Sequence, residues 1–464
     1  MFVEFVPPDL RPPSRLTGRR PDNHERLKLS AHVPSYWAAT AGPEPEGLAP
    51  LPGDRTAEVA VLGGGYTGLA AAYRLAGDHG VDTVVLEACA IGWGASGRNG
   101  GFAMISLGKL SLQEREARWG LPAARRAVRL GIDACERVRE LIVKEDLACD
   151  VQPDGWINVA HRPDRVPVLR ERLRLYHERL DFRDVEFLDR ERLAEEGFTR
   201  SPSAHGALRI RPTFGLHPLK YARGLALAAH RRGAAIHPDS PVVRWEKDSG
   251  WHVLATPGGT VRARRVVIGT NGYTPEHLHP FLRGRTLSAT SNILVTRPLT
   301  DAEWDEVGMR TTQVYTDTRT LVHYWRRLPD GRMLFGGRAG VIDTEASLAR
   351  RRRWLEGRLA AMFPCLRGIG SEYFWHGAVC MPYDRVPHVH TVDDDPTVAY
   401  ALAYTGSGVA MATYLGGLAG DLAAGVPVPR DTPVTGTGLP RFPLPILRRA
   451  YLAGAYLVYA LKDR

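Results

Sequence analysis

A short glycine-rich segment has the residue types and spacing that bind the phosphates of a dinucleotide. Residues 63–68 read Gly-Gly-Gly-Tyr-Thr-Gly and stand between an apolar stretch, 59–62, and a segment predicted to be helical. Gly63 permits a tight turn, Gly65 lets the backbone approach a pyrophosphate, and Gly68 lets the helix pack closely on a sheet. The helix N-terminus would direct free N–H groups and a positive dipole end toward phosphate. The expected ligand contacts here are Gly63, Gly65, Tyr66, Thr67 and Gly68.

An acidic residue stands where the ribose of such a dinucleotide would lie. A second apolar strand is predicted over 83–86, and Glu87 follows it directly. The order strand, glycine turn, helix, strand and acid is typical of a dinucleotide-binding βαβ unit, whereas an ordinary α/β domain would not explain Glu87. The carboxylate can accept hydrogen bonds from ribose hydroxyls and would repel a 2′-phosphate, which disfavours NADP. The motif alone does not separate FAD from NAD.

A second glycine-rich loop, residues 92–101, follows Glu87. It contains one cation and several small hydrogen-bonding residues, a composition that suits close backbone packing against a large, flat ligand. A flexible surface loop is the alternative interpretation. The residues expected to contact the ligand are Ala95, Ser96, Arg98, Asn99, Gly100 and Gly101.

Several segments together resemble the FAD-dependent amine and amino-acid oxidoreductases of the D-amino-acid-oxidase superfamily, and in particular its γ-glutamylputrescine oxidase branch. The resemblance spans roughly residues 30–464 and specifies the superfamily rather than a substrate. It implies FAD as the cofactor, with further contacts from Val243, Thr270, Asn271 and Gly272. The segments that carry it are 35–40, 83–101, 266–273, 375–377, 384–387 and 404–409.

The C-terminal part of this pattern can also be interpreted from its residues alone, as a strand, a glycine turn and a helix. A buried strand is predicted over 398–404, a Gly-Ser-Gly turn over 406–408 and a small-residue helix over 409–424. A helix that begins at a glycine turn directs N–H groups at its tip, where they would stabilise the negative charge of a reduced flavin. A plain buried βα unit is the alternative. The expected contacts are Gly406, Ser407, Gly408 and Val409.

The resemblance implies an α/β fold in which a Rossmann-type FAD-binding domain is interleaved with a mainly antiparallel-sheet substrate domain. The expected division is an N-terminal arm and short helix at 1–54, FAD-binding pieces at 55–105, 205–275 and 375–430, substrate-domain pieces at 106–204 and 276–374, and a C-terminal tail or helix at 431–464. Helices are predicted near 31–40, 121–146, 164–180, 189–196 and 346–363, and strands near 155–160, 241–246, 251–256, 261–268, 286–296, 312–326 and 332–336.

The implied reaction is oxidation of the C–N bond of an amine or amino acid to an imine by hydride transfer to flavin N5. Oxygen or an electron carrier would reoxidise the flavin, and positioning of the substrate would supply most of the catalysis. Candidate substrate-side residues are His323, Tyr324, Arg326 and Arg338. Strand alternation places His323 opposite Tyr324 and Arg326, so only one set can face the flavin. Arg326 or Arg338 would clamp a substrate carboxylate, unless both are surface arginines of an edge strand.

Two other functions stay open: a biosynthetic flavoenzyme that oxidises a specialised metabolite, and a flavin-binding protein without turnover. FAD attachment is expected to be non-covalent. Some relatives attach it through a His or Cys, and His376 and Cys380 lie near the C-terminal flavin segment. The spacer from Cys380 to Asp384 is, however, shorter than in the sarcosine-oxidase branch.

Composition excludes several other classes. The chain has 464 residues, 44% of them hydrophobic, and no stretch approaches the roughly 20 apolar residues of a membrane span. Five scattered cysteines without CxxC spacing indicate a reducing cytoplasm. The net charge of +10 is spread over arginines, which argues against nucleic-acid binding. His388 and His390 have no third ligand nearby, so no metal site is expected. The apolar run 444–461 would pack on the domain, on a partner or weakly on a membrane surface.

Overall fold

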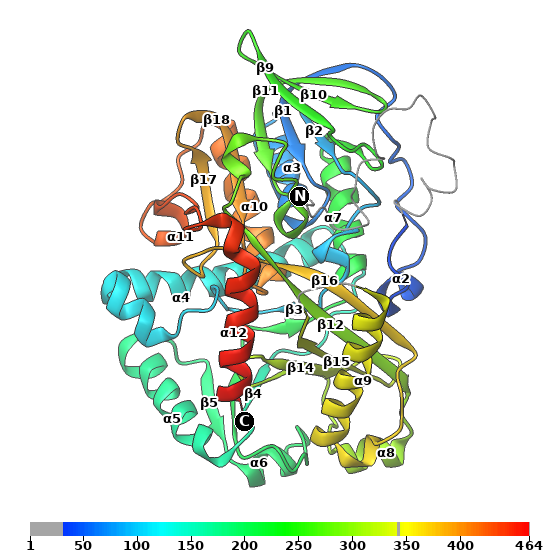
Figure 1. Cartoon of the computed structure of the whole chain (residues 1–464), viewed down its shortest axis with the longest axis vertical. Helices are drawn as coiled ribbons and strands as arrows, with labels where there is room; N and C mark the ends of the chain where they lie inside the picture. The colour runs from blue at the N-terminus through cyan, green and yellow to red at the C-terminus, as the bar shows by residue number, and fades with distance from the viewer. Residues whose placement is uncertain (1–30, 341–343, 464) are drawn as a thin grey trace.

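The strands of the described residues form two eight-stranded sheets and one two-stranded sheet (Figure 1). The computed structural model describes residues 31–340 and 344–463. The arm expected at residues 1–30 lies outside this range. The short helix expected after it is α2, Tyr36–Thr40, which begins with the Ser35 hydroxyl accepting a hydrogen bond from the Ala38 N–H.

The first sheet has the order β17-β18-β11-β1-β2-β8, with a β9–β10 hairpin attached to β11. Its central strands, from β8 to β18, run parallel, and β17 is antiparallel to β18. The four residues of β2 are all buried, as expected for a parallel strand that is covered on both faces. The strands are β1 Arg55–Leu62, β2 Thr83–Leu86, β8 Ala235–His237, β9 Arg244–Asp248, β10 Trp251–Thr256, β11 Gly259–Ile268, β17 His388–Val392 and β18 Asp395–Leu402.

Three helices pack together beside this sheet: α3 (Tyr66–Asp78), α7 (Pro218–Arg231) and α10 (Gly408–Ala424). The α3 and α10 backbones approach closely, because a Cβ atom at Gly416 would lie 2.4 Å from the Thr67 carbonyl oxygen. The turn before α3 and the turn before α10 therefore have a fixed relative position.

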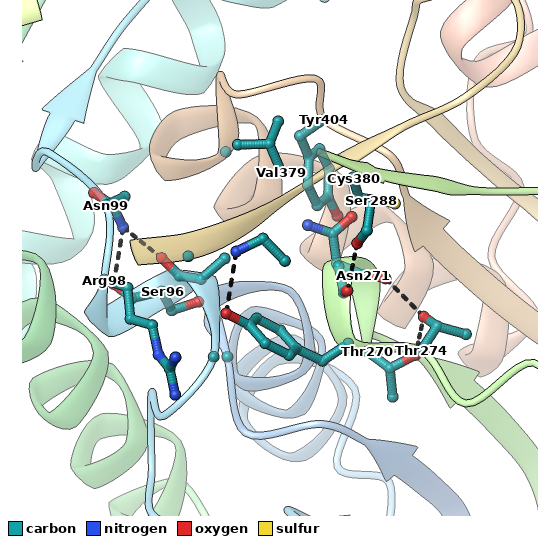
Figure 2. A pocket seen from close by; sticks show the side chains of 18 of the residues that line it. Ser96, Arg98, Asn99, Thr270, Asn271, Thr274, Ser288, Val379, Cys380 and Tyr404 are labelled. Carbon is teal, nitrogen blue, oxygen red and sulfur yellow. Dashed lines mark hydrogen bonds between the residues drawn. The ribbon is translucent and has the colours of Figure 1, made fainter. Parts of the chain in front are cut away.

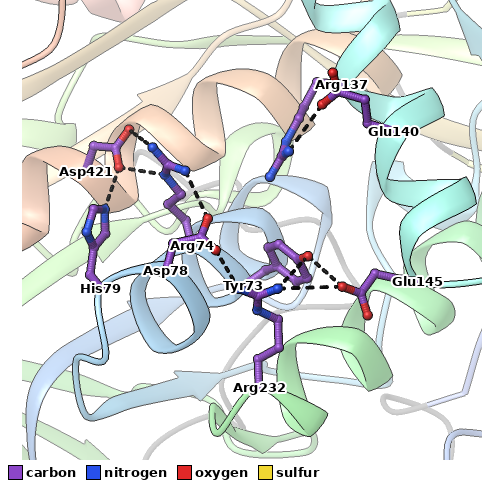
Figure 3. Close-up of polar contacts among 9 residues, drawn as sticks. All are labelled: Tyr73, Arg74, Asp78, His79, Arg137, Glu140, Glu145, Arg232 and Asp421. Carbon is purple, nitrogen blue, oxygen red and sulfur yellow. Dashed lines mark hydrogen bonds and ion pairs between the residues drawn. The ribbon is translucent and has the colours of Figure 1, made fainter.

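A polar network ties these helices to one another and to α4, Leu112–Lys144 (Figure 3). Asp421 of α10 lies 2.8 Å from Arg74 Nε and 2.6 Å from His79 Nε2. The Tyr73 hydroxyl donates to the Glu145 carboxylate at 2.5 Å and accepts from Arg232 at 2.9 Å. Asp421 is 6% exposed, so this part of the network contributes to stability more than a surface ion pair would.

The second sheet has the order β16-β12-β15-β14-β13-β4-β6-β5, and every neighbouring pair is antiparallel except β13–β4. Apolar side chains of α8 (Asp301–Val307) and α9 (Glu345–Met362) pack into a core with its strands. The strands are β4 Trp156–Val159, β5 Val185–Leu188, β6 Ala207–Ile210, β12 Leu287–Pro298, β13 Val314–Asp317, β14 His323–Arg327, β15 Arg332–Arg338 and β16 Tyr373–Met381. The two-stranded sheet pairs β3, Phe102–Ala103, with β7, Phe214–Gly215.

Two expectations about this sheet need correction. The single strand expected over 312–326 is two strands, because the Asp317 carboxylate accepts hydrogen bonds from the Arg319 and His323 N–H groups and thereby closes a turn. Residues 207–210 and 375–381, expected in the FAD-binding pieces, instead belong to β6 and β16 of the second sheet. Pairing decides this, since β16 aligns with β12 from Leu287↔Met381 to Val295↔Tyr373.

The remaining helices agree broadly with the expected ranges. α4 begins nine residues before the expected helix at 121–146, and Gly120 (φ 76°) interrupts its helical geometry. The helix expected at 164–180 is α5, Val166–Arg174, followed by a π-helical turn at Leu175–Arg179. The others are α6 Arg190–Glu195, α11 Pro433–Gly436 and α12 Arg448–Lys462. Among the described helices, none combines the length and the apolar character needed to cross a membrane.

The C-terminal helix α12 lies across the molecule in Figure 1, with its C-terminal end near the β4 side of the second sheet. Two contacts hold it. At its start, Arg448 Nη2 lies 3.0 Å from Glu276 Oε2. At its end, the Asp463 carboxylate accepts hydrogen bonds from the N–H groups of Thr320 and Leu321 at 2.7 and 2.8 Å. The run expected to be a C-terminal helix therefore packs on the chain itself.

Candidate active site

A single cavity of about 2140 Å³ is lined by residues of both large sheets. Pockets that bind drug-sized ligands measure roughly 300–1,000 Å³, so this cavity has room for a large cofactor and a substrate together. Nearly all the expected cofactor contacts line it; Gly68 and Gly101 are the exceptions. Those on its wall are Gly63, Gly65, Tyr66, Thr67, Glu87, Ala95, Ser96, Arg98, Asn99, Gly100, Val243, Thr270, Asn271, Gly272, Gly406, Ser407, Gly408 and Val409.

The glycine turn after β1 has the geometry that its sequence predicts. Gly63 has φ 106°, a conformation that favours glycine. A Cβ atom at Gly68 would lie 1.9 Å from the Gly63 carbonyl oxygen, so the helix start packs against the turn itself. A Cβ atom at Gly65 would lie 2.8 Å from Ser96 Oγ, and that oxygen accepts the Tyr66 N–H at 3.0 Å. The second glycine-rich loop therefore packs directly on the first.

Glu87 follows the end of β2 at the cavity wall. Its carboxylate accepts hydrogen bonds from the Gly64 N–H at 2.5 Å and the Cys89 N–H at 2.9 Å. Burial raises the pKa of Glu87 to about 7, and these two backbone donors oppose that shift. A carboxylate has about four lone-pair sites, so it can still accept ribose hydroxyls.

Arg98 and Asn99 give the second loop its shape (Figure 2). The Asn99 side chain donates to the Ser96 carbonyl at 2.8 Å and accepts the Gly101 N–H at 2.7 Å. The Arg98 guanidinium stacks over Trp93, with its Cζ 4.1 Å from the ring centroid, and Nε donates to the Trp93 carbonyl. Its Nη2 is buried without a hydrogen-bond partner. Such an unpaired donor on a cavity wall indicates a ligand acceptor.

The ends of β11 and β18 meet at the same wall. Asn271, with φ 44°, accepts the Ala403 N–H through its side-chain oxygen at 2.9 Å and so joins the two strand ends. Figure 2 shows Asn271 beside Thr270, whose hydroxyl lies 2.7 Å from that of Thr274. In open α/β sheets, ligands bind at the carboxyl ends of the parallel strands.

The turn between β18 and α10 completes this side of the cavity. Gly406 has φ 99°, and α10 begins at Gly408. The Thr405 hydroxyl is buried without a hydrogen-bond partner, which makes it a second unpaired group on the wall. The Thr67 hydroxyl lies 2.7 Å from the Tyr404 hydroxyl and connects this turn to the first glycine turn.

Tyr324 and Arg338 line the cavity from the second sheet. The Tyr324 hydroxyl lies 2.9 Å from Ser291 Oγ, and its ring packs edge-on against Phe102. Arg338 Nη2 donates to the Thr405 carbonyl at 2.7 Å, which brings the end of β15 to the turn before α10. Burial raises the pKa of Tyr324 to about 12 and lowers that of Arg338.

His323 and Arg326, also expected on the substrate side, do not line the cavity. His323 Nδ1 lies 3.0 Å from Asp317 Oδ2, and its ring faces α9. Arg326 shares a strand face with Tyr324, but its guanidinium donates to the Leu216 carbonyl at 2.8 Å and to Gln152 at 2.9 Å. The structure therefore places Arg326 among buried carbonyls rather than where a substrate carboxylate would bind.

The residues considered for covalent attachment and for metal binding have other environments. His376 and Cys380 both line the cavity, and burial raises the pKa of the Cys380 thiol to about 12, which keeps it neutral. His388 Nε2 lies 2.9 Å from Asp384 Oδ2. Within residues 31–340 and 344–463, no group of three His, Cys, Asp or Glu side chains is arranged to hold a metal ion.

Several cavity residues were not anticipated from the sequence. Lys109 is the most informative of them, because it is one of only six lysines in an arginine-rich chain and follows a glycine after the second loop. That isolation is the signal that could have identified it. Others on the wall are Phe102, Trp156, Arg172, Arg319, Arg449 and Leu452.

Comparison with known proteins identifies relatives that match nearly the whole chain. The chain is 32% identical to the probable oxidoreductase OrdL of Rhizobium meliloti, over 93% of this chain and 98% of that protein. It is 30% identical to the gamma-glutamylputrescine oxidoreductase of Escherichia coli, over 94% and 99%. Among solved structures, glycine oxidase from Geobacillus kaustophilus has a TM-score of 0.66 and 19% identity, covering 81% of this chain and 96% of that one. This last similarity supports the fold.

A family model described as DAO, FAD dependent oxidoreductase, matches residues 58–422. The cavity wall fits FAD: Arg98 Nη2 and Thr405 Oγ1 are buried polar atoms that lack partners, and the glycine turns leave backbone exposed to the ligand. The α/β fold with its two large sheets agrees with the expectation from the sequence. The chain belongs to the DAO family of FAD-dependent oxidoreductases.

Proposed function

We propose that this protein oxidises the C–N bond of an amine or amino acid to an imine. When bound, FAD supplies the hydride acceptor at flavin N5. The observation that carries the proposal is the single cavity that joins the glycine turns of the first sheet to Tyr324 and Arg338 of the second. The names of the relatives, gamma-glutamylputrescine oxidoreductase and glycine oxidase, support a C–N bond as the site of oxidation.

The residues that would hold FAD follow from the cavity wall. The turn at 63–68 and the N-terminus of α3 would bind the pyrophosphate, and Glu87 would accept the ribose hydroxyls. The segments 95–101, 270–272 and 406–409 would hold the rest of the cofactor. The N-terminus of α10 would stabilise negative charge on the reduced ring. The neutral Cys380 thiol supports non-covalent binding.

The substrate would lie against the second sheet. Tyr324 and Arg338 are the two expected substrate-side residues that line the cavity there. Phe102 packs on Tyr324, and Leu452 of α12 adds a further apolar side chain to the wall, so water would be displaced when the amine binds. Orientation of the α-C–H bond, rather than a nucleophile, would supply most of the rate enhancement.

All five cysteines lie in the described residues and are free thiols, which supports a reducing, cytoplasmic location.

Anaerobic reduction of the purified, FAD-loaded protein tests the proposal. We expect at least one member of a panel of primary amines, secondary amines and amino acids to bleach the visible flavin band, and the product imine to hydrolyse to a carbonyl compound. Reoxidation by oxygen, compared with a quinone or dye acceptor, then distinguishes an oxidase from a dehydrogenase. A protein that binds no FAD, or whose flavin stays oxidised with the whole panel, would refute the proposal.

A further inference from the structure

Exposed apolar side chains gather at the C-terminal end of the chain. Within the described residues, eleven large hydrophobic side chains are exposed, and five of them lie between positions 444 and 458. Scattered exposed apolar residues are normal in a folded protein, whereas a contiguous group of them marks a binding surface. We call this group the C-terminal apolar surface; its members are Leu444, Ile446, Leu447, Tyr451 and Val458.

The helix α12 carries most of this surface on one face. Leu447, Tyr451 and Val458 follow one another at spacings of four and seven residues, which places them on the same side of a helix. Leu452, on the other side, is 5% exposed and lines the cavity. In Figure 1, α12 lies over the other elements of the molecule. The helix therefore packs on the chain with one apolar face and presents a second apolar face outward.

The backbone at Leu444 supports a role for the exposed side chains. Leu444 has φ 46°, a conformation that a glycine or an asparagine adopts more readily, and its side chain is 65% exposed. Neither packing nor backbone preference accounts for a leucine at this position. Strained residues of this kind tend to occur where a binding surface requires the side chain.

The charges around the C-terminal apolar surface all have one sign. Residues 432–462 contain four cations, Arg441, Arg448, Arg449 and Lys462, and no acid. Arg449 and Lys462 are exposed at the two ends of α12, and the twelve residues between them, 450–461, carry no charge. The helix thus has an uncharged centre with a cation at each end.

This distribution of charge favours an anionic partner over a second copy of the chain. Two copies paired through α12 about a two-fold axis would bring cationic ends together, whether the helices ran parallel or antiparallel, and like charges repel. An anionic lipid surface takes up both features, because its headgroups attract the cations and its acyl boundary accepts the apolar side chains. None of the described helices can cross a membrane, so α12 would lie in the plane of the lipid surface.

We propose that the C-terminal apolar surface binds the protein to the surface of an anionic lipid membrane. Tyr451 would lie at the level of the headgroups, where an aromatic ring with a polar end is stable. Ile446 is 71% exposed and also lines the cavity, so the cavity reaches the protein surface beside the bound membrane. The proposal is independent of which substrate the enzyme oxidises.

The test is flotation of the FAD-loaded protein with lipid vesicles, with flavin absorbance as the measure of bound protein. One set of vesicles contains equal parts of phosphatidylglycerol and phosphatidylcholine, and the other contains phosphatidylcholine alone. We expect at least about 10-fold tighter binding to the anionic vesicles, because each cation near such a surface contributes about a five-fold gain in affinity. Added salt should reduce this preference, since it screens exposed charges.

Variants assign the binding to the C-terminal apolar surface. The double variant Leu447→Ser, Val458→Ser should bind anionic vesicles at least about 10-fold more weakly, because two side chains no longer leave water. The matched control is Val143→Ser, Val168→Ser, which changes exposed valines of α4 and α5 and should bind like the unaltered protein. Lys462→Gln should weaken binding to anionic vesicles about five-fold and leave binding to neutral vesicles unchanged.

Three results would overturn the proposal. The first is that the unaltered protein binds neither set of vesicles, or binds both equally, which requires no variant to fold. The second is unchanged vesicle binding by the double variant Leu447→Ser, Val458→Ser with a normal flavin content. The third is a dimer of the unaltered protein, detected by light scattering, that this double variant abolishes while vesicles bind neither form, since a second copy would then cover the surface. None of these measurements depends on turnover, so they stay separate from the test of amine oxidation.

Discussion

Two adjacent glycines of α10 provide a matched test of how the cofactor-binding turns are positioned. A Cβ atom at Gly416 would lie 2.4 Å from the Thr67 carbonyl oxygen, 2.9 Å from its Cα and 3.0 Å from its carbonyl carbon. All three neighbours are backbone atoms of α3, so no side chain can rotate away. A Cβ atom at Gly417 would meet nothing within 4 Å. The two positions share a helix and differ only in the face that they present.

The expected changes in the free energy of unfolding follow from this geometry. Forcing a methyl group into a tight contact costs about 1–3 kcal/mol, and the backbone contacts place Gly416→Ala toward the upper end. Replacing glycine by alanine inside a helix stabilises the folded protein by up to about 1 kcal/mol. We therefore expect Gly416→Ala to lower the free energy of unfolding by about 1–2 kcal/mol and Gly417→Ala to raise it by about 0.5–1 kcal/mol.

Urea denaturation followed by circular dichroism measures the difference, and flavin fluorescence reports release of FAD in the same samples. We expect Gly416→Ala to release FAD at lower urea as well, because separation of α3 and α10 displaces both glycine turns. If Gly416→Ala is as stable as Gly417→Ala and holds FAD equally well, the close approach of the two helices does not position the cofactor site.

Three further outcomes follow from individual side chains. Burial raises the pKa of Glu87 from its ordinary 4.5 to about 7, so the folded protein binds a proton that the unfolded chain has released between these pH values. The FAD-free protein should therefore lose stability as pH rises from 4.5 to about 7. Glu87→Gln should remove this dependence in denaturation curves measured from about pH 4 to 8. Arg338→Gln should lower kcat/KM for a carboxylate-bearing substrate by about 10- to 100-fold while the flavin content stays constant. Asp421→Asn should cost about 1–2 kcal/mol in urea denaturation. Arg129→Met, which removes an exposed pair with Asp133, should change little, and equal effects would mean that the network around Asp421 adds no stability.

The features that can be predicted from sequence are positions where only one residue type suits the local structure. Gly63 and Gly68 are such residues, because a turn in the left-handed region and a 1.9 Å approach to a carbonyl exclude any side chain. Glu87 is another, since an acid directly after a buried strand has few structural reasons to be there. Gly63 and Glu87 line the cavity, whereas Gly68 supports the turn from behind the wall.

The features that sequence did not specify depend on contacts between distant segments. Alternation places Arg326 on the same strand face as Tyr324, but it does not say that Gln152 and the Leu216 carbonyl surround its guanidinium. The turn after β13 depends on one carboxylate, Asp317, that accepts two backbone N–H groups. The isolation of Lys109 in the sequence does not say that it shares a cavity wall with Arg338, 229 positions later.

A crystal structure of the FAD-loaded protein tests the central claim most directly. We expect the flavin ring within the cavity, between the turn at 405–408 and the wall formed by Tyr324 and Arg338. A flavin ring outside this cavity would contradict the proposed site.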